Sequence, residues 1–139
     1  MTKSKTHIIP YSTFLYELTI LENANQYVKF VHLHYLGWPD FGAPKETEPI
    51  INLVKDVRQI IATNPNLKTR RDKFTVLVHC SAGVGRTGTF IALYQMMEKL
   101  DILVPQFEKG GIYRDLTIDI FNTAFNLRHK RVFMVCTQT

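Results

Sequence analysis

Hydrophobic and polar positions alternate in the first part of the chain. From Phe14 to Ile20 the apolar side chains fall on every second position, which predicts a half-buried strand. The polar segment 22–26 contains two asparagines and is interpreted as a turn. Residues 27–36 are rich in β-branched and aromatic side chains and predict a second strand. The pattern therefore predicts a β-hairpin.

Later segments have helical spacing. Thr47 and Pro49 are typical of a helix start, and the helix is expected to end near Thr63, before Pro65. Its apolar positions are Ile50, Leu53, Val54, Val57, Ile60 and Ile61. Residues 89–100 predict a second helix, followed by an irregular segment over 102–111. Thr117 and Asp119 open a third helix. Its expected buried face comprises Ile120, Phe121, Ala124, Phe125 and Leu127.

A short apolar run, residues 74–79, predicts a buried strand after the polar linker 64–73. Strands mixed with helices predict an α/β or α+β fold, with a mixed twisted sheet flanked by helices. The 139 residues suit one domain, and the 45% hydrophobic content excludes wholesale disorder. No apolar stretch is long enough to span a membrane.

Charge and cysteine content limit the partners and the cellular compartment that the chain suits. The formal net charge of +5 favours anionic partners, or else only a solubilising surface. The basic segment 68–73 lacks interleaved aromatic residues, so it is interpreted as a solvated linker and no nucleic-acid partner is expected. Two cysteines cannot form a disulfide framework, and no secretion signal is recognisable. A cytoplasmic location with free thiols is therefore expected.

The segment with the most chemical information is Val-His-Cys-Ser-Ala-Gly-Val-Gly-Arg-Thr-Gly-Thr-Phe, residues 78–90. A chain that turns from strand into helix points backbone N–H groups into one concavity, where the helix dipole also favours an anion. These amides and Arg86 would favour the thiolate of Cys80, and Thr87 could donate to the sulfur. Arg86 could grip two phosphate oxygens. The loop thus combines a nucleophile with an oxyanion clamp.

A dinucleotide-binding loop is the rival interpretation, because Gly83, Gly85 and Gly88 spell G-x-G-x-x-G. That motif requires an acidic residue at the end of a second strand, and Asp101 instead precedes the segment 102–105. It also leaves Cys80 and Arg86 without a role. No Walker motif is present, and the histidines have no metal-ligand spacing. We therefore expect neither a cofactor nor a metal.

The loop resembles the signature of protein tyrosine phosphatases, His-Cys-x-x-Gly-x-x-Arg followed by Ser or Thr. The matching residues are His79, Cys80, Gly83, Arg86 and Thr87. The resemblance implies that Cys80 attacks phosphorus and becomes a phosphocysteine. It implies that the equatorial oxygens are held by Arg86 and by the amides of Ser81, Ala82, Gly83, Val84, Gly85 and Arg86. His79 would support the loop and lower the pKa of the cysteine; the alternative is a buried core histidine.

Two further segments resemble the same family. Trp38-Pro39-Asp40 matches the family's mobile acid loop, so Asp40 would protonate the leaving tyrosine oxygen and then activate water, with Trp38 in support. The segment from Ile118 to Val135 resembles the last motif of the catalytic domain, whose arginine-rich end flanks the active site. Arg128 and Arg131 could equally serve only to compensate the helix dipole.

The resemblance covers about residues 13–137, the C-terminal half or so of a typical phosphatase domain, so we expect a single, N-terminally truncated domain. Residues 1–12 hold no counterpart of the phosphotyrosine-recognition loop, and the upstream glutamate that orients the signature arginine is also missing. Cys136 replaces the family's water-positioning glutamine. We expect weaker substrate selection, slower hydrolysis of the phosphocysteine, and uncovered apolar surface that favours self-association.

These features leave three hypotheses. The preferred one is an enzyme that hydrolyses phosphotyrosine in proteins through a phosphocysteine. The second is a phosphotyrosine-binding decoy without turnover, and the third is an inactive truncated domain.

Overall fold

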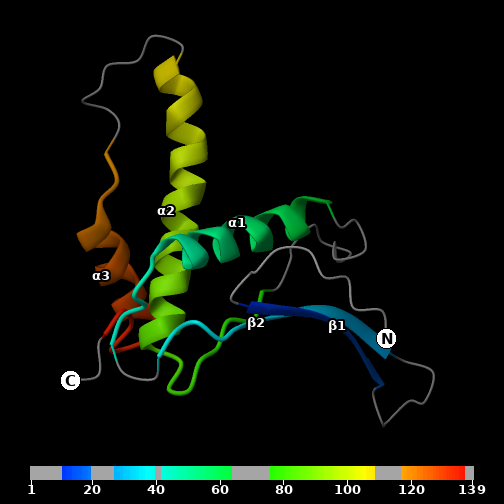
Figure 1. Ribbon diagram of the computed structural model, residues 1–139. Helices are drawn as coiled ribbons and strands as arrows, with labels where there is room; N and C mark the ends of the chain where they lie inside the picture. Colours follow the sequence, from blue (N-terminus) through cyan, green and yellow to red (C-terminus); the bar gives the residue numbers. More distant parts are fainter. Residues whose placement is uncertain (1–10, 20–26, 40–41, 64–75, 109–116, 137–139) are drawn as a thin grey trace. The chain divides into compact units, whose positions relative to one another are not determined.

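The computed structural model describes residues 11–19, 27–39, 42–63, 76–108 and 117–136, which form two strands and three helices (Figure 1). The chain divides into two compact units, Met1–Phe74 and Thr75–Thr139, and each is described by itself. The first contains β1, β2 and α1, and the second contains α2 and α3. That the whole chain is one phosphatase domain stays a prediction.

The predicted hairpin is confirmed. Strands β1 (Tyr11–Thr19) and β2 (Tyr27–Tyr35) pair antiparallel, with Tyr11 opposite Tyr35 and Thr19 opposite Tyr27. The predicted turn at 22–26 lies outside the described residues. Over the described ranges the sheet has these two strands, so the larger mixed twisted sheet is not confirmed.

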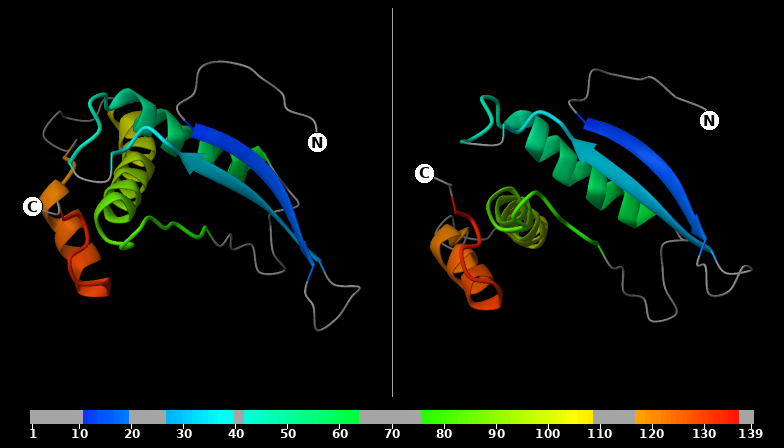
Figure 2. Two further views of the ribbon diagram at one scale, coloured as in Figure 1. Left: turned by 60° about the horizontal axis from the view of Figure 1, so that its bottom comes forward. Right: turned by 90° about the horizontal axis from the view of Figure 1, so that it is seen from below.

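Helix α1 (Glu48–Thr63) has the predicted bounds and runs alongside the hairpin (Figure 2). The Thr47 carbonyl accepts the Ile51 N–H at 3.3 Å, with Pro49 in the first turn, where its missing N–H costs nothing. The buried stripe consists of Ile50, Leu53, Val54 and Val57. The periodic pattern therefore identified the helix and all four buried positions, whereas Ile60 and Ile61, which it also predicted, are half-buried.

Helix α2 (Gly85–Glu108) is longer than predicted. It begins inside the glycine-rich loop, and it continues through 102–108, so the prediction of an irregular segment is wrong there. Pro105 stands in the final turn, where its missing N–H removes one hydrogen bond of the helix. One lost bond so close to the end does not terminate the helix.

The predicted strand at 74–79 is wrong over its described part, because residues 76–80 have no regular secondary structure. Val76 is 46% exposed and Leu77 is 86% exposed. A strand needs a neighbour to satisfy its backbone groups, and no described segment pairs with this one. The apolar run correctly marked the approach to the loop but not its conformation.

Helix α3 (Ile120–Lys130) begins where predicted. The Asp119 carboxylate caps it by accepting the Asn122 backbone N–H at 2.8 Å. The predicted buried face is wrong except at its end: Leu127 is buried, whereas Ile120, Phe121 and Phe125 are 67%, 75% and 49% exposed. Ala124 is half-buried. Exposed apolar surface is thus present, while self-association stays a prediction.

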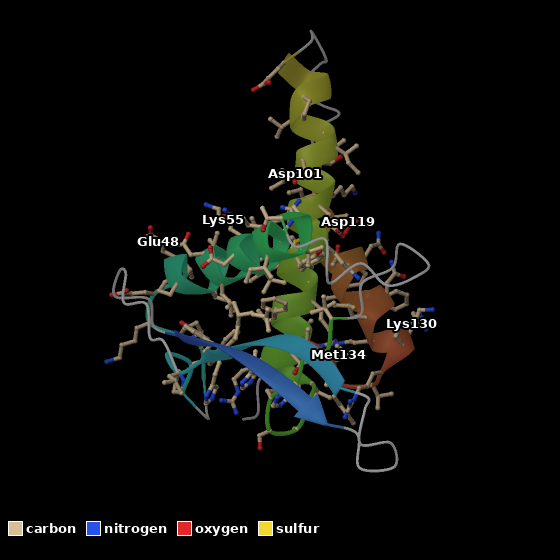
Figure 3. The ribbon with its side chains drawn as sticks, turned by 90° about the vertical axis from the view of Figure 1, so that its right-hand side faces the viewer. Glu48, Lys55, Asp101, Asp119, Lys130 and Met134 are labelled. Carbon is tan, nitrogen blue, oxygen red and sulfur yellow. The ribbon has the colours of Figure 1, made fainter. Side chains whose placement is uncertain are left out.

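The core of the second unit lies where the end of α3 meets the first half of α2. Ala92, Leu127 and Met134 are buried together, with Val84, Ile91, Met96 and Val135 packed against them. Figure 3 shows Met134 beside the lower part of α2 and the end of α3. This packing brings the chain after α3 against the loop that leads into α2. No helix in the described ranges is long and apolar enough to cross a membrane.

Candidate active site

The Cys80 loop, residues 80–86, leads directly into α2. The Gly83 N–H donates to Cys80 Sγ at 3.2 Å, so the loop curls back over the thiol. Gly83 has a φ of 70°, a left-handed conformation that glycine adopts without a Cβ penalty. The N-terminus of the helix follows at Gly85. Amide donors and the positive end of the α2 dipole therefore meet beside the sulfur, which is the arrangement that binds an anion.

This loop lowers the pKa of the Cys80 thiol. Partial burial raises its pKa, but the nearby Thr87 hydroxyl and the backbone N–H groups of Thr87, Gly83 and Val84 outweigh that effect and lower the pKa to about 7. The Thr87 hydroxyl is buried and has no hydrogen-bond partner of normal geometry within the described residues. Its effect on the sulfur is therefore that of a nearby dipole rather than of a formed bond. A large share of the thiol is ionised at neutral pH, as a nucleophile requires.

The other predicted residues of the loop are placed as follows. Arg86 is half-buried in the first turn of α2. His79 is exposed, which excludes the alternative of a buried core histidine. Ser81 and Ala82 are exposed, and Gly83, Val84 and Gly85 are half-buried. The structure thus brings the predicted loop residues together around Cys80, while their roles in binding phosphate stay predictions.

A turn after α3, residues 131–136, packs against the Cys80 loop. The Val135 N–H donates to the Val84 carbonyl at 3.1 Å. Val135 has a φ of 58° and Phe133 a φ of 64°, a costly conformation for side chains of these types. Arg128 holds the strained turn, because its Nε donates to the Met134 carbonyl at 3.0 Å and its Nη2 to the Val135 carbonyl at 3.4 Å.

Two glycines of α2 allow the turn to approach closely. A Cβ at Gly85 would lie 2.7 Å from the Cys136 carbonyl oxygen, and one at Gly88 would collide with the Val135 backbone nitrogen. These two positions therefore require glycine so that the two backbone segments can come into contact. Cys136, which replaces the expected glutamine, is thereby held beside the end of the Cys80 loop.

Arg131 also reaches the loop. Its Nη2 donates to the Ala82 carbonyl at 3.2 Å across 49 positions of sequence. Sequence reasoning placed the arginine-rich end near the active site and left dipole compensation as an alternative. It assigned Arg128 and Arg131 no carbonyl partners, because only the packing of α3 on α2 defines them.

The candidate acid is not placed. Asp40 lies outside the described residues, so its role stays a prediction. Around it, Trp38 Nε1 donates to the Gly42 carbonyl at 3.1 Å, and Gly42 has a φ of 101°. This bond connects the two sides of the predicted acid loop, while the supporting role of Trp38 stays a prediction.

Elsewhere, the described residues form an open depression but no cluster of metal ligands. Their His, Cys, Asp and Glu side chains form no cluster of three or more that could hold a metal ion. An open depression of about 670 Å³ is lined by Lys99 and residues 117–121. Lys99 lies about 20 Å along α2 from Gly85 at 1.5 Å per residue, so this depression is separate from Cys80.

Comparison with known proteins shows the family. Residues 2–139 match the family model of the protein-tyrosine phosphatases. Human receptor-type tyrosine-protein phosphatase eta is 38% identical over 105 residues, which cover 76% of this chain and 6% of that protein. Human tyrosine-protein phosphatase non-receptor type 9 is 32% identical over 131 residues, covering 88% of this chain and 20% of that protein. This chain therefore spans a small part of the relatives that it matches.

Solved structures agree on the fold. The crystal structure of Trypanosoma brucei protein tyrosine phosphatase TbPTP1 superposes with a TM-score of 0.65 at 23% identity. The superposition covers 91% of this chain and 37% of that one. The Cys80 loop, the glycine contacts of α2 and the turn after α3 thus occur in a chain that belongs to the protein-tyrosine phosphatase family.

Proposed function

We propose that this chain hydrolyses phosphotyrosine in proteins through a phosphocysteine at Cys80. The observation that carries the proposal is the Cys80 thiol, which accepts the Gly83 N–H beside the N-terminus of α2 and has a pKa of about 7. A thiolate needs this environment to attack a phosphate dianion, because the amides and the helix dipole offset the repulsion between two negative charges.

In the first step the Cys80 sulfur forms a bond to phosphorus, and the bond from phosphorus to the tyrosine oxygen breaks. Asp40 donates its proton to that oxygen, so tyrosine leaves neutral. The loop amides and Arg86 hold the equatorial oxygens as charge develops on them. In the second step water attacks phosphorus, Asp40 takes its proton, and the sulfur leaves as the thiolate. Inorganic phosphate is the second product.

Cys136 makes the second step the slower one in this proposal. A glutamine at this position would orient the attacking water, and a thiol is a weaker hydrogen-bonding group. With p-nitrophenyl phosphate we expect a burst of p-nitrophenol roughly equal to the enzyme concentration, followed by slow turnover. Cys136→Gln should raise the steady rate and leave the burst in place.

The direct test compares a phosphotyrosine peptide with the matching phosphoserine peptide. Release of phosphate from the tyrosine peptide that is lost in Cys80→Ser supports the proposal. A folded protein that binds the peptide without releasing phosphate would instead identify a binding module, and one that does neither would be an inactive domain. Phosphotyrosine proteins are the proposed partners, and a reducing compartment such as the cytoplasm would keep the free Cys80 thiol active.

A further inference from the structure

One peptide group of the Cys80 loop connects Arg131 to the nucleophile. The peptide between Ala82 and Gly83 is bonded on both sides: its carbonyl accepts from Arg131 Nη2 at 3.2 Å, and its N–H donates to Cys80 Sγ at 3.2 Å. In a planar trans peptide the C=O and N–H bonds point in opposite directions. A group that holds the carbonyl on one side therefore directs the N–H toward the other.

We propose that Arg131 is a positioning residue of the active site, which holds the Ala82 carbonyl outward and so keeps the Gly83 N–H directed at the Cys80 sulfur. The dipole-compensation alternative gives this side chain no specific partner. The inference rests on the proposed function for its catalytic meaning, but the bond network itself does not depend on turnover.

The conformation at Gly83 explains why such a restraint is needed. Rotation of the Ala82–Gly83 peptide changes ψ of the first residue and φ of the second, and glycine adopts positive and negative φ about equally well. The observed φ of 70° is thus one of two accessible states. In the flipped state a carbonyl oxygen would face the thiolate in place of the N–H donor. The glycine makes the required geometry possible, and Arg131 selects it.

The contact is also steric. A Cβ at Gly83 would lie 3.3 Å from Nη1 and 3.4 Å from Nη2 of Arg131, so the guanidinium is packed against the glycine itself. The guanidinium further polarises the peptide, because a cation at the carbonyl strengthens the N–H as a donor. Among the described residues, His79 and Arg86 are the titratable or charged neighbours of Cys80 along the chain, and Arg131 comes to the loop from the end of α3.

The test measures the pH dependence of Cys80 alkylation by iodoacetamide in the Cys136→Ser background, so that Cys80 is the thiol that reacts. Arg131→Met removes the guanidinium and keeps an unbranched stem. Lys130→Met is the matched control, because Lys130 is an exposed cation in the last turn of α3, next to Arg131 in sequence (Figure 3). Both variants lose one positive charge. Arg131 is exposed, so its removal opens no buried cavity.

Arg131→Met is expected to move the alkylation midpoint up by about 0.5–1 pH unit, which lowers the rate at pH 6 about three- to tenfold. Hydrogen exchange at the Gly83 amide should accelerate in the same variant, and Lys130→Met should change neither. Arg131→Gln, which removes the guanidinium but keeps a polar side chain, should shift both readouts in the same direction.

Two results would overturn the inference. One is a folded Arg131→Met or Arg131→Gln protein with an unchanged midpoint and unchanged Gly83 exchange. The other is an equal shift of the midpoint in Lys130→Met. That result would show that net charge, and not the held peptide, determines the pKa of the Cys80 thiol. Neither readout requires phosphatase turnover, so failure of the proposed function would leave this test intact.

Discussion

Replacing Gly88 by alanine tests the packing of the turn after α3 on α2. Gly88 lies in the first turn of α2, and a Cβ there would collide with the Val135 backbone nitrogen and come within 3.2 Å of the Met134 carbonyl carbon. Both contacts are with backbone, which cannot rotate away as a side chain could. The turn would have to move as a unit, away from the Cys80 loop.

The expected change in the free energy of unfolding of Gly88→Ala is the sum of opposing effects. Alanine is the better helix former by up to about 1 kcal/mol, which alone would stabilise the variant. Overpacking of a closed contact costs roughly 1–3 kcal/mol. Displacing the turn also weakens the 3.1 Å bond from Val135 N–H to the Val84 carbonyl, which contributes about 1 kcal/mol. The net expectation is a loss of about 1–3 kcal/mol, a fall in Tm of about 3–12 °C.

Thermal unfolding followed by circular dichroism measures the effect. Asn126→Ala is the matched control, because Asn126 is exposed within α3 and alanine there improves helix propensity without a new contact. The control should melt at or slightly above the wild-type temperature. A Gly88→Ala protein as stable as wild type, or more stable, would refute the close approach of the two backbones.

Three further predictions concern the thiol, the core and the helix cap. Iodoacetamide should alkylate Cys80 with a midpoint near pH 7, so that about a tenth of it is thiolate at pH 6; a midpoint near 8.5, the value of an unperturbed thiol, would contradict the loop geometry. Leu127→Ala should lower the free energy of unfolding by about 2–5 kcal/mol in urea, because Leu127 is buried against Ala92 and Met134; a loss below about 1 kcal/mol would show that this core is not packed. Asp119→Ala should lower Tm at pH 7 by removing the α3 cap. Bonds from Asn122 lower the pKa of Asp119 in the folded state. The stabilisation by this carboxylate is therefore present above the pKa of the unfolded state and is lost as the pH falls through the pKa of the folded state. A Tm difference between wild type and Asp119→Ala that persists at pH 2 would contradict the cap.

The sequence predicted those elements whose signals are local. The stripe of α1 and its end before Pro65 follow from spacing and from the restriction that proline imposes. The Asp119 cap follows from a side chain that satisfies the amides of its own helix. The Cys80 loop was found through residues that are adjacent in sequence. Each signal lies within one segment and needs no partner elsewhere.

The errors concern what covers a segment. An apolar run such as 74–79 specifies a preference for burial but supplies no neighbouring strand, and Leu77 is in fact exposed. The amphipathic pattern of α3 likewise shows which side chains could be buried, yet Phe121 and Phe125 stack on each other at 6.0 Å between ring centroids while both remain exposed. The contacts of Arg131 and Arg128 with backbone carbonyls depend on tertiary packing and could not be predicted from spacing.

Capture of the covalent intermediate tests whether Cys80 is the nucleophile. The protein is mixed with p-nitrophenyl phosphate, quenched in acid within the burst, digested, and analysed by mass spectrometry. We expect phosphate on the peptide that contains Cys80, more of it than in Cys136→Gln, and none in Cys80→Ser. A folded protein whose Cys80 is alkylated readily at pH 7 but never carries phosphate would contradict a phosphocysteine mechanism.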